Sequence, residues 1–265
     1  MQLFTLASGS TGNCTLVRDQ GCSILIDMGI STKRLREALF ALGMSPDELS
    51  GILITHEHRD HICGLNTFVK KYEVPILAPR TIANHLRWSI LEIEDYIAEL
   101  DIGHENSVAG LSVLPFRTPH DTPESVGYRI TGTSTLAFCT DFGYVSDEMR
   151  EGLYGVENAV IEANHDIQML ANGAYPSYLK RRILSDHGHL SNTDCASLAL
   201  WLAQSGTKSI VLAHLSRENN TPRLAYDTVG SILCREGFEA GRDIQLAVAP
   251  ECQTLSVSLE RCKNA

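Results

Sequence analysis

Long apolar runs are absent from this sequence of 265 residues. No segment approaches the ~18 uncharged apolar residues needed to cross a membrane, and the N-terminus lacks the basic start and long apolar stretch of a secretory signal. Linkers are absent as well, because no tract rich in proline, glycine or serine divides the chain. We therefore expect a soluble, cytoplasmic protein without a membrane partner, folded as a single domain over residues 1–265 and ordered except at its last three residues.

Paired cysteines and an excess of positive charge are also missing. The eight cysteines are scattered and form no C-x-x-C pair, which favours reduced, buried thiols over disulfides. Acidic residues outnumber basic ones by 32 to 22, and the net charge of −10 argues against a protein that coats nucleic acid through a broad basic surface. A nuclease is still compatible with this charge, because bound divalent cations make a cleft locally attractive to a phosphodiester.

Short β-rich runs alternate with amphipathic stretches of helical period along the chain. The predicted strands span residues 15–17, 23–27, 52–54, 75–78, 113–116, 125–130, 135–138, 159–161, 209–212, 244–248 and 255–259. The predicted helices run from Ser31 or Thr32 to about Gly43 and over residues 62–72, 191–204 and 221–236. Two similar halves of mixed strands and helices predict an α/β fold in which two packed sheets are covered by helices on both outer faces.

A dense group of metal-ligand residues follows the predicted strand 52–54. The run His56-Glu57-His58-Arg59-Asp60-His61 supplies three imidazoles and the carboxylate of Asp60 within six residues. On a tight loop these side chains can face two neighbouring metal positions, and their chemistry favours zinc, manganese or iron over calcium. Hydrolysis with two metals needs this density of ligands, since one ion activates water while the other polarises the substrate. The loop therefore predicts a site for two divalent metal ions.

Three further candidates lie where predicted strands end. His120 follows strand 113–116, Asp141 follows strand 135–138, and His214 follows strand 209–212. A single polar residue in such a place is more often a hydrogen-bonded structural residue than a ligand. Together with the six-residue cluster, however, the three predict the remaining metal ligands.

Taken in order, these residues resemble the five motifs of the metallo-β-lactamase superfamily: Asp27 at the end of a strand, the cluster at 56–61, His120, Asp141 and His214. The resemblance covers nearly the whole chain. It implies a four-layer αββα sandwich with the site at one edge of the two sheets.

The resemblance also implies how the ligands divide between two metals. One metal would be held by His56, His58 and His120, and the other by Asp60, His61 and His214. Asp141 would bridge both metals. Asp27 would orient the loop from behind the ligands, as metal-bound imidazoles require.

The substrate class depends on residues outside the ligand set, because this fold serves lactams, thioesters and phosphodiesters. Glu162 and His189 are similar to elements of the tRNase Z type phosphodiesterases, in which a glutamate orients a histidine that protonates the leaving alkoxide. An imidazolium suits that role near neutral pH. Glu162, His189 and Asp60 are therefore the predicted catalytic residues. His187 is the alternative acid and His165 a weaker one, and both members of the pair could instead be structural.

Two more stretches resemble the YycJ/WalJ-like exonuclease group: residues 7–14, Ala-Ser-Gly-Ser-Thr-Gly-Asn-Cys, and residues 214–220, His-Leu-Ser-Arg-Glu-Asn-Asn. The resemblance implies a 5′-to-3′ exonuclease acting on DNA ends. Small residues in the first stretch allow close backbone approach to a terminal phosphate, and Ser8, Ser10 and Asn13 are the predicted phosphate-binding residues. A tight turn between two strands is an equally good interpretation of the glycines.

The sequence thus favours a metal-dependent phosphodiesterase, a 5′-to-3′ exonuclease with DNA ends as its partner. A tRNase Z-like RNA phosphodiesterase is an alternative, weakened because no Gly/Pro- and Lys-rich insertion for clamping tRNA is present. A thioesterase or small-molecule hydrolase and a metal-binding regulatory module are further alternatives. Basic residues such as Lys33, Arg36 and the run at 180–182 could follow a nucleic-acid strand, although solvated helix faces explain most of them. The oligomeric state is left open.

Overall fold

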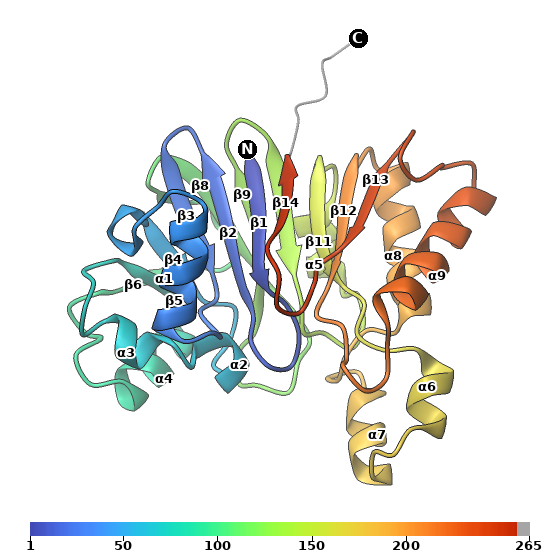
Figure 1. Ribbon diagram of the computed structural model, residues 1–265, viewed down its shortest axis with the longest axis horizontal. Coiled ribbons are helices and arrows are strands. Elements are labelled where there is room, and N and C mark those ends of the chain that lie inside the picture. The colour runs from blue at the N-terminus through green and yellow to red at the C-terminus, as the bar shows by residue number, and fades with distance from the viewer. Residues whose placement is uncertain (259–265) are drawn as a thin grey trace.

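The computed structural model describes residues 1–258, so the last residue of the predicted strand 255–259 and the three final residues predicted to lack order lie outside the described part. Two seven-stranded sheets pack face to face (Figure 1). The first contains, in spatial order, β14 (Leu255–Ser258), β1 (Gln2–Ala7), β2 (Cys14–Asp19), β3 (Cys22–Ile26), β4 (Gly51–Leu53), β5 (Ile76–Pro79) and β6 (Ile97–Leu100). The second contains β13 (Gln245–Val248), β12 (Ser209–Ala213), β11 (Asn158–Glu162), β10 (Thr135–Cys139), β9 (Val126–Thr131), β8 (Leu111–Arg117) and β7 (Asn106–Val108).

The two sheets follow the same plan, as the similar halves of the sequence predict. In the first sheet β1 to β3 are antiparallel and β3 to β6 are parallel. In the second sheet β7 to β10 are antiparallel and β10 to β13 are parallel. Parallel strands end on the same side of their sheet, so the loops that follow them gather at one edge.

Helices cover both outer faces of the paired sheets and complete the predicted αββα sandwich. Over the first sheet lie α1 (Thr32–Ala41), the 3₁₀ turn η1 (Pro46–Glu48), α2 (Arg59–Ile62), α3 (Leu65–Phe68) and α4 (Arg80–Ser89). Beside the second sheet lie α5 (Asp147–Leu153), α8 (Asn192–Gln204) and α9 (Pro222–Arg235). Two short helices, α6 (Ile167–Asn172) and α7 (Ser177–Ile183), project beyond the ends of the strands at the lower right of Figure 1.

The central strands are apolar on both faces because each face packs against another layer. Val160 of β11 and Val211 of β12 belong to the core that contains the first sheet. Their neighbours Ala159 and Ile210 belong to a second core formed with α8 and α9. Burial on both faces explains why these strands appear in the sequence as continuous apolar runs instead of alternating ones.

The single helix predicted over residues 62–72 is wrong. The chain forms α2 and α3 instead, with a break at Cys63 and Gly64. Gly64 lies so close to the main chain that an added Cβ would meet the carbonyl oxygen of Ile30 at 2.1 Å, and its N–H donates to Met28 O. Helices α4 to α7 and strands β1, β6 and β7 were not predicted.

The cysteines of residues 1–258 are free thiols, as predicted, but only some are buried. Seven free thiols are present in residues 1–258, and four of them, Cys14, Cys22, Cys139 and Cys195, are buried. The other three, Cys63, Cys234 and Cys252, are exposed, which corrects the prediction for these positions. Within the same residues no helix is long and apolar enough to span a lipid bilayer.

Candidate metal centre

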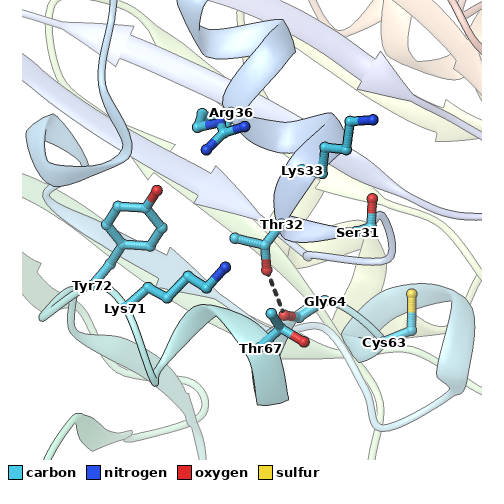
Figure 2. Close-up of a pocket in the computed structure, with 9 residues that line it drawn as sticks. All are labelled: Ser31, Thr32, Lys33, Arg36, Cys63, Gly64, Thr67, Lys71 and Tyr72. Atoms are coloured by element: carbon cyan, nitrogen blue, oxygen red, sulfur yellow. Dashed lines mark hydrogen bonds between the residues drawn. The ribbon is translucent and has the colours of Figure 1, made fainter.

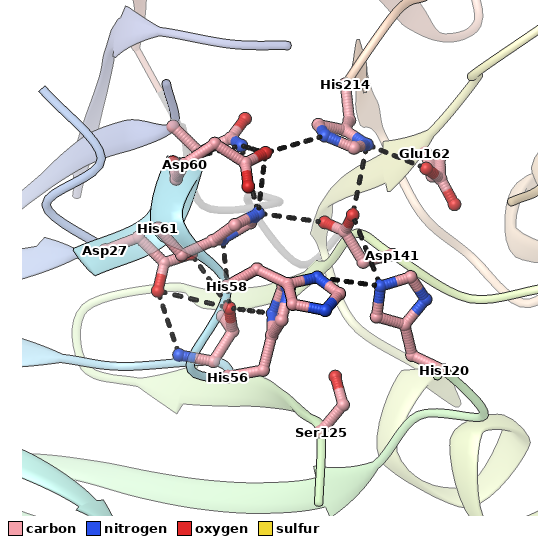
Figure 3. A network of polar contacts seen from close by, with 12 residues as sticks. Asp27, His56, His58, Asp60, His61, His120, Ser125, Asp141, Glu162 and His214 are labelled. Atoms are coloured by element: carbon pink, nitrogen blue, oxygen red, sulfur yellow. Dashed lines mark hydrogen bonds and ion pairs between the residues drawn. The ribbon is translucent and has the colours of Figure 1, made fainter. Parts of the chain in front are cut away.

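The predicted metal ligands come from loops at one edge of the two sheets, where they converge (Figure 3). Asp27 follows β3, Asp141 follows β10 and His214 follows β12. All three have left-handed backbone conformations, with φ of 62°, 62° and 55° respectively. Such conformations are costly for residues other than glycine and tend to occur at functional sites, where the surrounding fold enforces them. Here each one turns a side chain at a strand end toward the centre of the site.

One group of candidate ligands consists of His56, His58 and His120. One ring nitrogen from each lies within 4.8 Å of the others, and His120 Nε2 is 3.4 Å from His58 Nδ1. His56 and His120 are buried, whereas His58 is partly exposed. The three imidazoles thus form one open three-ligand position, as the resemblance implied.

A second group consists of Asp60, His61 and His214. Their ligand atoms also lie within 4.8 Å of one another, with Asp60 Oδ2 at 3.6 Å from His61 Nε2 and 3.7 Å from His214 Nε2. Asp60 comes from α2 and His214 from the end of β12, so the two sheets contribute jointly. This arrangement matches the second ligand set implied by the resemblance.

Asp141 lies between the two groups. Its Oδ2 is 3.4 Å from His61 Nε2, and its Oδ1 is 3.9 Å from His120 Nε2. The carboxylate is buried, and Oδ2 has no hydrogen-bond donor among the described residues. Asp141 therefore lies close to members of both groups, as a bridging ligand would.

The orientation of the imidazoles suits metal binding. His61 Nδ1 donates to Asp27 Oδ2 at 2.8 Å, His214 Nδ1 donates to Glu162 Oε1 at 2.8 Å, and His120 Nδ1 faces the carbonyl oxygen of Gly188 at 3.2 Å. With the N–H on Nδ1, each ring presents the lone pair of Nε2 to the centre. Asp27 is fully buried and lies behind His61, on the side away from Nε2.

Unpartnered buried atoms test whether a cation fits here. His56 Nε2, His214 Nε2 and Asp141 Oδ2 are all buried and have no hydrogen-bond partner in the described part of the chain. Buried polar atoms in proteins nearly always have a hydrogen-bond partner. Several buried acceptor atoms that face one another would be satisfied by a cation placed between them. The donor set of imidazoles and carboxylates therefore fits divalent metal binding.

Carboxylates around the rings also shift their titration. Burial lowers the pKa of His61, but the charges of Asp27 and Asp141 outweigh burial and raise it to about 9. For His214 the charge of Asp141 and the contacts with Asp60 and Glu162 outweigh burial and hold the pKa well above its usual range. Protons thus compete with a metal for these nitrogens, and metal binding has to displace them.

Glu162 and His189, which were paired from sequence alone, are in contact. His189 Nδ1 donates to Glu162 Oε1 at 2.8 Å, and Glu162 Oε2 accepts the backbone N–H groups of Phe142 and Leu190 at 3.1 Å each. Burial lowers the pKa of His189, but Glu162 outweighs it and leaves the pKa above its ordinary value. His187, in contrast, is exposed and does not line the cleft described below, and His165 is buried without a hydrogen bond to Glu162.

Glu162 has a second partner that the sequence did not indicate. The same Oε1 atom accepts from Nδ1 of the metal-ligand candidate His214, so one buried carboxylate orients both His189 and His214. Since both Glu162 oxygens are occupied by N–H donors, Glu162 is a poor metal ligand even though its atoms lie near Asp141 and His214.

A cleft of about 250 Å³ opens over this centre. His58, Asp60, Asp141, His189 and His214 line it together with Tyr175, Leu179, Arg182 and Ile183 from α7 and the turn before it. The Arg182 guanidinium is paired with Asp121, whose Oδ1 lies 3.3 Å from His120 Nε2. The sequence did not assign α7 to the site. For the ion pair between Arg182 and Asp121, the sequence offered one indication, which is that Asp121 directly follows His120.

The three predicted phosphate-binding residues occupy different places. Ser10 is exposed and lines the cleft. Ser8 is buried, and its hydroxyl accepts the backbone N–H of His214 at 2.8 Å. Asn13 is buried too, with Oδ1 accepting from Gly9 N and Nδ2 lying 3.3 Å from Asp60 Oδ2. Ser8 and Asn13 therefore hold the metal-ligand loops in place.

Five converging imidazoles and two carboxylates at the edge of an αββα sandwich define a metal-dependent hydrolase. A family model described as the beta-lactamase superfamily domain matches residues 23–215. The chain belongs to the metallo-β-lactamase superfamily, close to the YycJ group.

Curated relatives cover nearly the full length. The chain is 39% identical over 246 residues to the exodeoxyribonuclease YycJ of Bacillus anthracis, covering 91% of this chain and 92% of that protein. It is 35% identical over 250 residues to the exodeoxyribonuclease WalJ of Streptococcus pneumoniae, covering 91% of each. Among solved structures, the metallo-β-lactamase fold protein YhfI from Bacillus subtilis superposes with a TM-score of 0.71 at 15% identity, covering 97% of this chain and 99% of that one. The structural likeness supports the fold, and the sequence likeness supports the group.

Proposed function

We propose that this protein is a metal-dependent exonuclease that removes nucleotides from DNA ends in the 5′-to-3′ direction. The observation that carries the proposal is the buried Glu162, which orients His189 at a cleft beside the metal-ligand groups. The names of the full-length relatives, exodeoxyribonucleases YycJ and WalJ, support the same substrate. A DNA substrate also agrees with the predicted cytoplasmic location.

Two divalent ions, zinc or manganese with iron also compatible, would occupy the centre. His56, His58 and His120 would hold one of them, Asp60, His61 and His214 the other, with Asp141 between. When bound, the ions would supply positive charge to the phosphodiester and lower the pKa of water. Asp27 and Glu162 would keep His61 and His214 in the tautomer that presents Nε2.

His189 would supply the proton for the leaving oxygen. Its Nδ1 is held by Glu162, so Nε2 is the ring nitrogen that remains for the substrate. The pKa above the ordinary value keeps the imidazolium populated near neutral pH, and an alkoxide is a poor leaving group without a proton. Arg182 would add a positive charge on the α7 side of the cleft, and Ser10 would face the terminal phosphate.

The direct test is digestion of 5′-labelled single-stranded DNA, double-stranded DNA and RNA with Mn²⁺ or Zn²⁺, followed by sizing of the products. We expect labelled mononucleotide to appear first from DNA, which defines both the exonucleolytic mode and the polarity. A His58→Ala variant purified in the same way controls for contaminating nuclease and should be inactive. Absence of nucleotide release with every metal tested would sink the proposal.

The same assay distinguishes the alternatives. An RNA phosphodiesterase would cut RNA and spare DNA, and a thioesterase or a regulatory module would release no nucleotide from either. The contact between Glu162 and His189 favours a phosphodiesterase over these last two, because thioester hydrolysis has less need of a proton donor for the leaving group and a sensor has none.

A further inference from the structure

A second cavity, of about 380 Å³, lies between α1 and α3, outside the metal cleft (Figure 2). Three basic side chains line it: Lys33 and Arg36 from α1, and Lys71 from the turn after α3. Hydroxyl groups of Ser31, Thr32 and Thr67 contribute polar lining, and no aspartate or glutamate lines the cavity. We call this cavity the α1–α3 pocket.

The charge in the α1–α3 pocket is not neutralised by neighbouring residues. Within residues 1–258, neither Arg36 nor Lys71 has a carboxylate within 4 Å, and Lys33 has only the exposed Glu37 at 3.9 Å. All three cationic residues are exposed. In a protein with a net charge of −10, cations concentrated at one accessible cavity favour an anionic ligand.

The α1–α3 pocket and the metal centre share a segment of chain. Asp60 and His61 face the centre, while Cys63 and Gly64, directly after them, line the pocket. This segment is fixed on both sides, because Met28 N donates to His61 O at 2.7 Å and Thr32 Oγ1 donates to Gly64 O at 3.2 Å. The metal centre and the α1–α3 pocket are therefore bordered by the same short segment, residues 60–64.

The metal cleft alone is small for a polymer. At about 250 Å³ it lies below the usual size of ligand pockets, roughly 300 to 1,000 Å³. Most of a nucleic-acid strand therefore has to lie outside it. We propose, on the basis of the exonuclease function above, that the α1–α3 pocket binds backbone phosphates of the DNA strand whose end lies at the metal centre.

The test compares a long and a short substrate for the double variant Arg36→Ala/Lys71→Ala. The long substrate is a single-stranded 30-mer, and the short one is the p-nitrophenyl ester of thymidine 5′-monophosphate, which cannot reach the pocket. Losing two phosphate contacts should make the slope of log(kcat/KM) against log[salt] less steep by about 1.4. This change in slope corresponds to a kcat/KM on the 30-mer roughly 25-fold below that of the wild type at 0.1 M salt. Turnover of the short ester should be unchanged.

A matched control removes the same charge elsewhere. Arg223→Ala/Arg235→Ala changes two exposed arginines on α9, on the other side of the molecule, and should behave as the wild type. The charge-conserving variant Arg36→Lys/Lys71→Arg should retain most of the activity on the 30-mer, which separates lost charge from damage to folding.

Failure of this inference differs from failure of the proposed function. If the wild type cleaves the 30-mer and the alanine double variant matches it in rate and salt slope, the pocket does not bind the strand. If inorganic phosphate alters the wild type and the double variant differently while their rates on the 30-mer agree, the pocket takes a free anion and the inference is wrong. If the wild type releases no nucleotide, the exonuclease function itself is wrong.

Discussion

Replacement of His189 by asparagine separates proton donation from metal binding. Asparagine removes the imidazole whose Nδ1 donates to Glu162 at 2.8 Å, while His214 keeps its own bond to Glu162. A positioned general acid contributes about 100- to 10,000-fold to the rate, or roughly 2.7 to 5.4 kcal/mol. We expect a loss of this size in kcat for an oligonucleotide, with unchanged metal content.

The leaving group provides the diagnostic. A p-nitrophenolate departs without a proton, so the p-nitrophenyl ester of thymidine 5′-monophosphate should be cleaved by His189→Asn at nearly the rate of the wild type. The measurements are kcat on both substrates and metal content by mass spectrometry. Equal losses on both substrates, or loss of a metal ion, would refute the reasoning, because His189 would then act as a ligand with Asp141 and His214 nearby.

Three further predictions follow from the contacts behind the ligands. Glu162→Gln should weaken metal binding about 10- to 100-fold, because the carboxylate orients His214, and metal titration measures this loss. The same variant should shift the alkaline limb of the profile of kcat against pH to lower pH, because Glu162 raises the pKa of His189. An unchanged profile would contradict this prediction. Asp27→Ala should lower the free energy of unfolding by about 3 to 5 kcal/mol in urea denaturation, because the buried donors of Thr55 and His61 then have no acceptor. Asp27→Asn should lose less stability, because asparagine keeps an acceptor oxygen and tolerates the left-handed backbone. The metal-free protein should lose stability as pH rises from 6.5 to about 9, because folding raises the pKa of His61 and the stabilisation from its bound proton disappears over that range. Metal affinity should rise over the same range, because fewer protons compete for the ring nitrogens. Calorimetric titration that shows the same affinity throughout would count against this prediction.

The sequence by itself determined the fold class and the candidate metal ligands. The run from His56 to His61 is contiguous, so its density of ligands is visible without knowing the fold. His120, Asp141 and His214 each follow an apolar run. Residues that directly follow strands of the same direction lie at one edge of the sheet. Local patterns of this kind survive folding because strand ends and short loops are set by nearby residues.

Contacts between distant segments were decided only by the tertiary structure. The break between α2 and α3 depends on the approach of Ile30 to Gly64, and the second bond of Glu162 joins residues 52 positions apart. Arg182 reaches the cleft because α7 folds back over the strand ends, and Lys71 joins Arg36 because α1 packs beside α3. No local sequence pattern predicts these contacts, because each depends on how whole layers of the fold pack together. The sequence thus specified which chemistry the metal centre can carry, and the packing specified what stands around it.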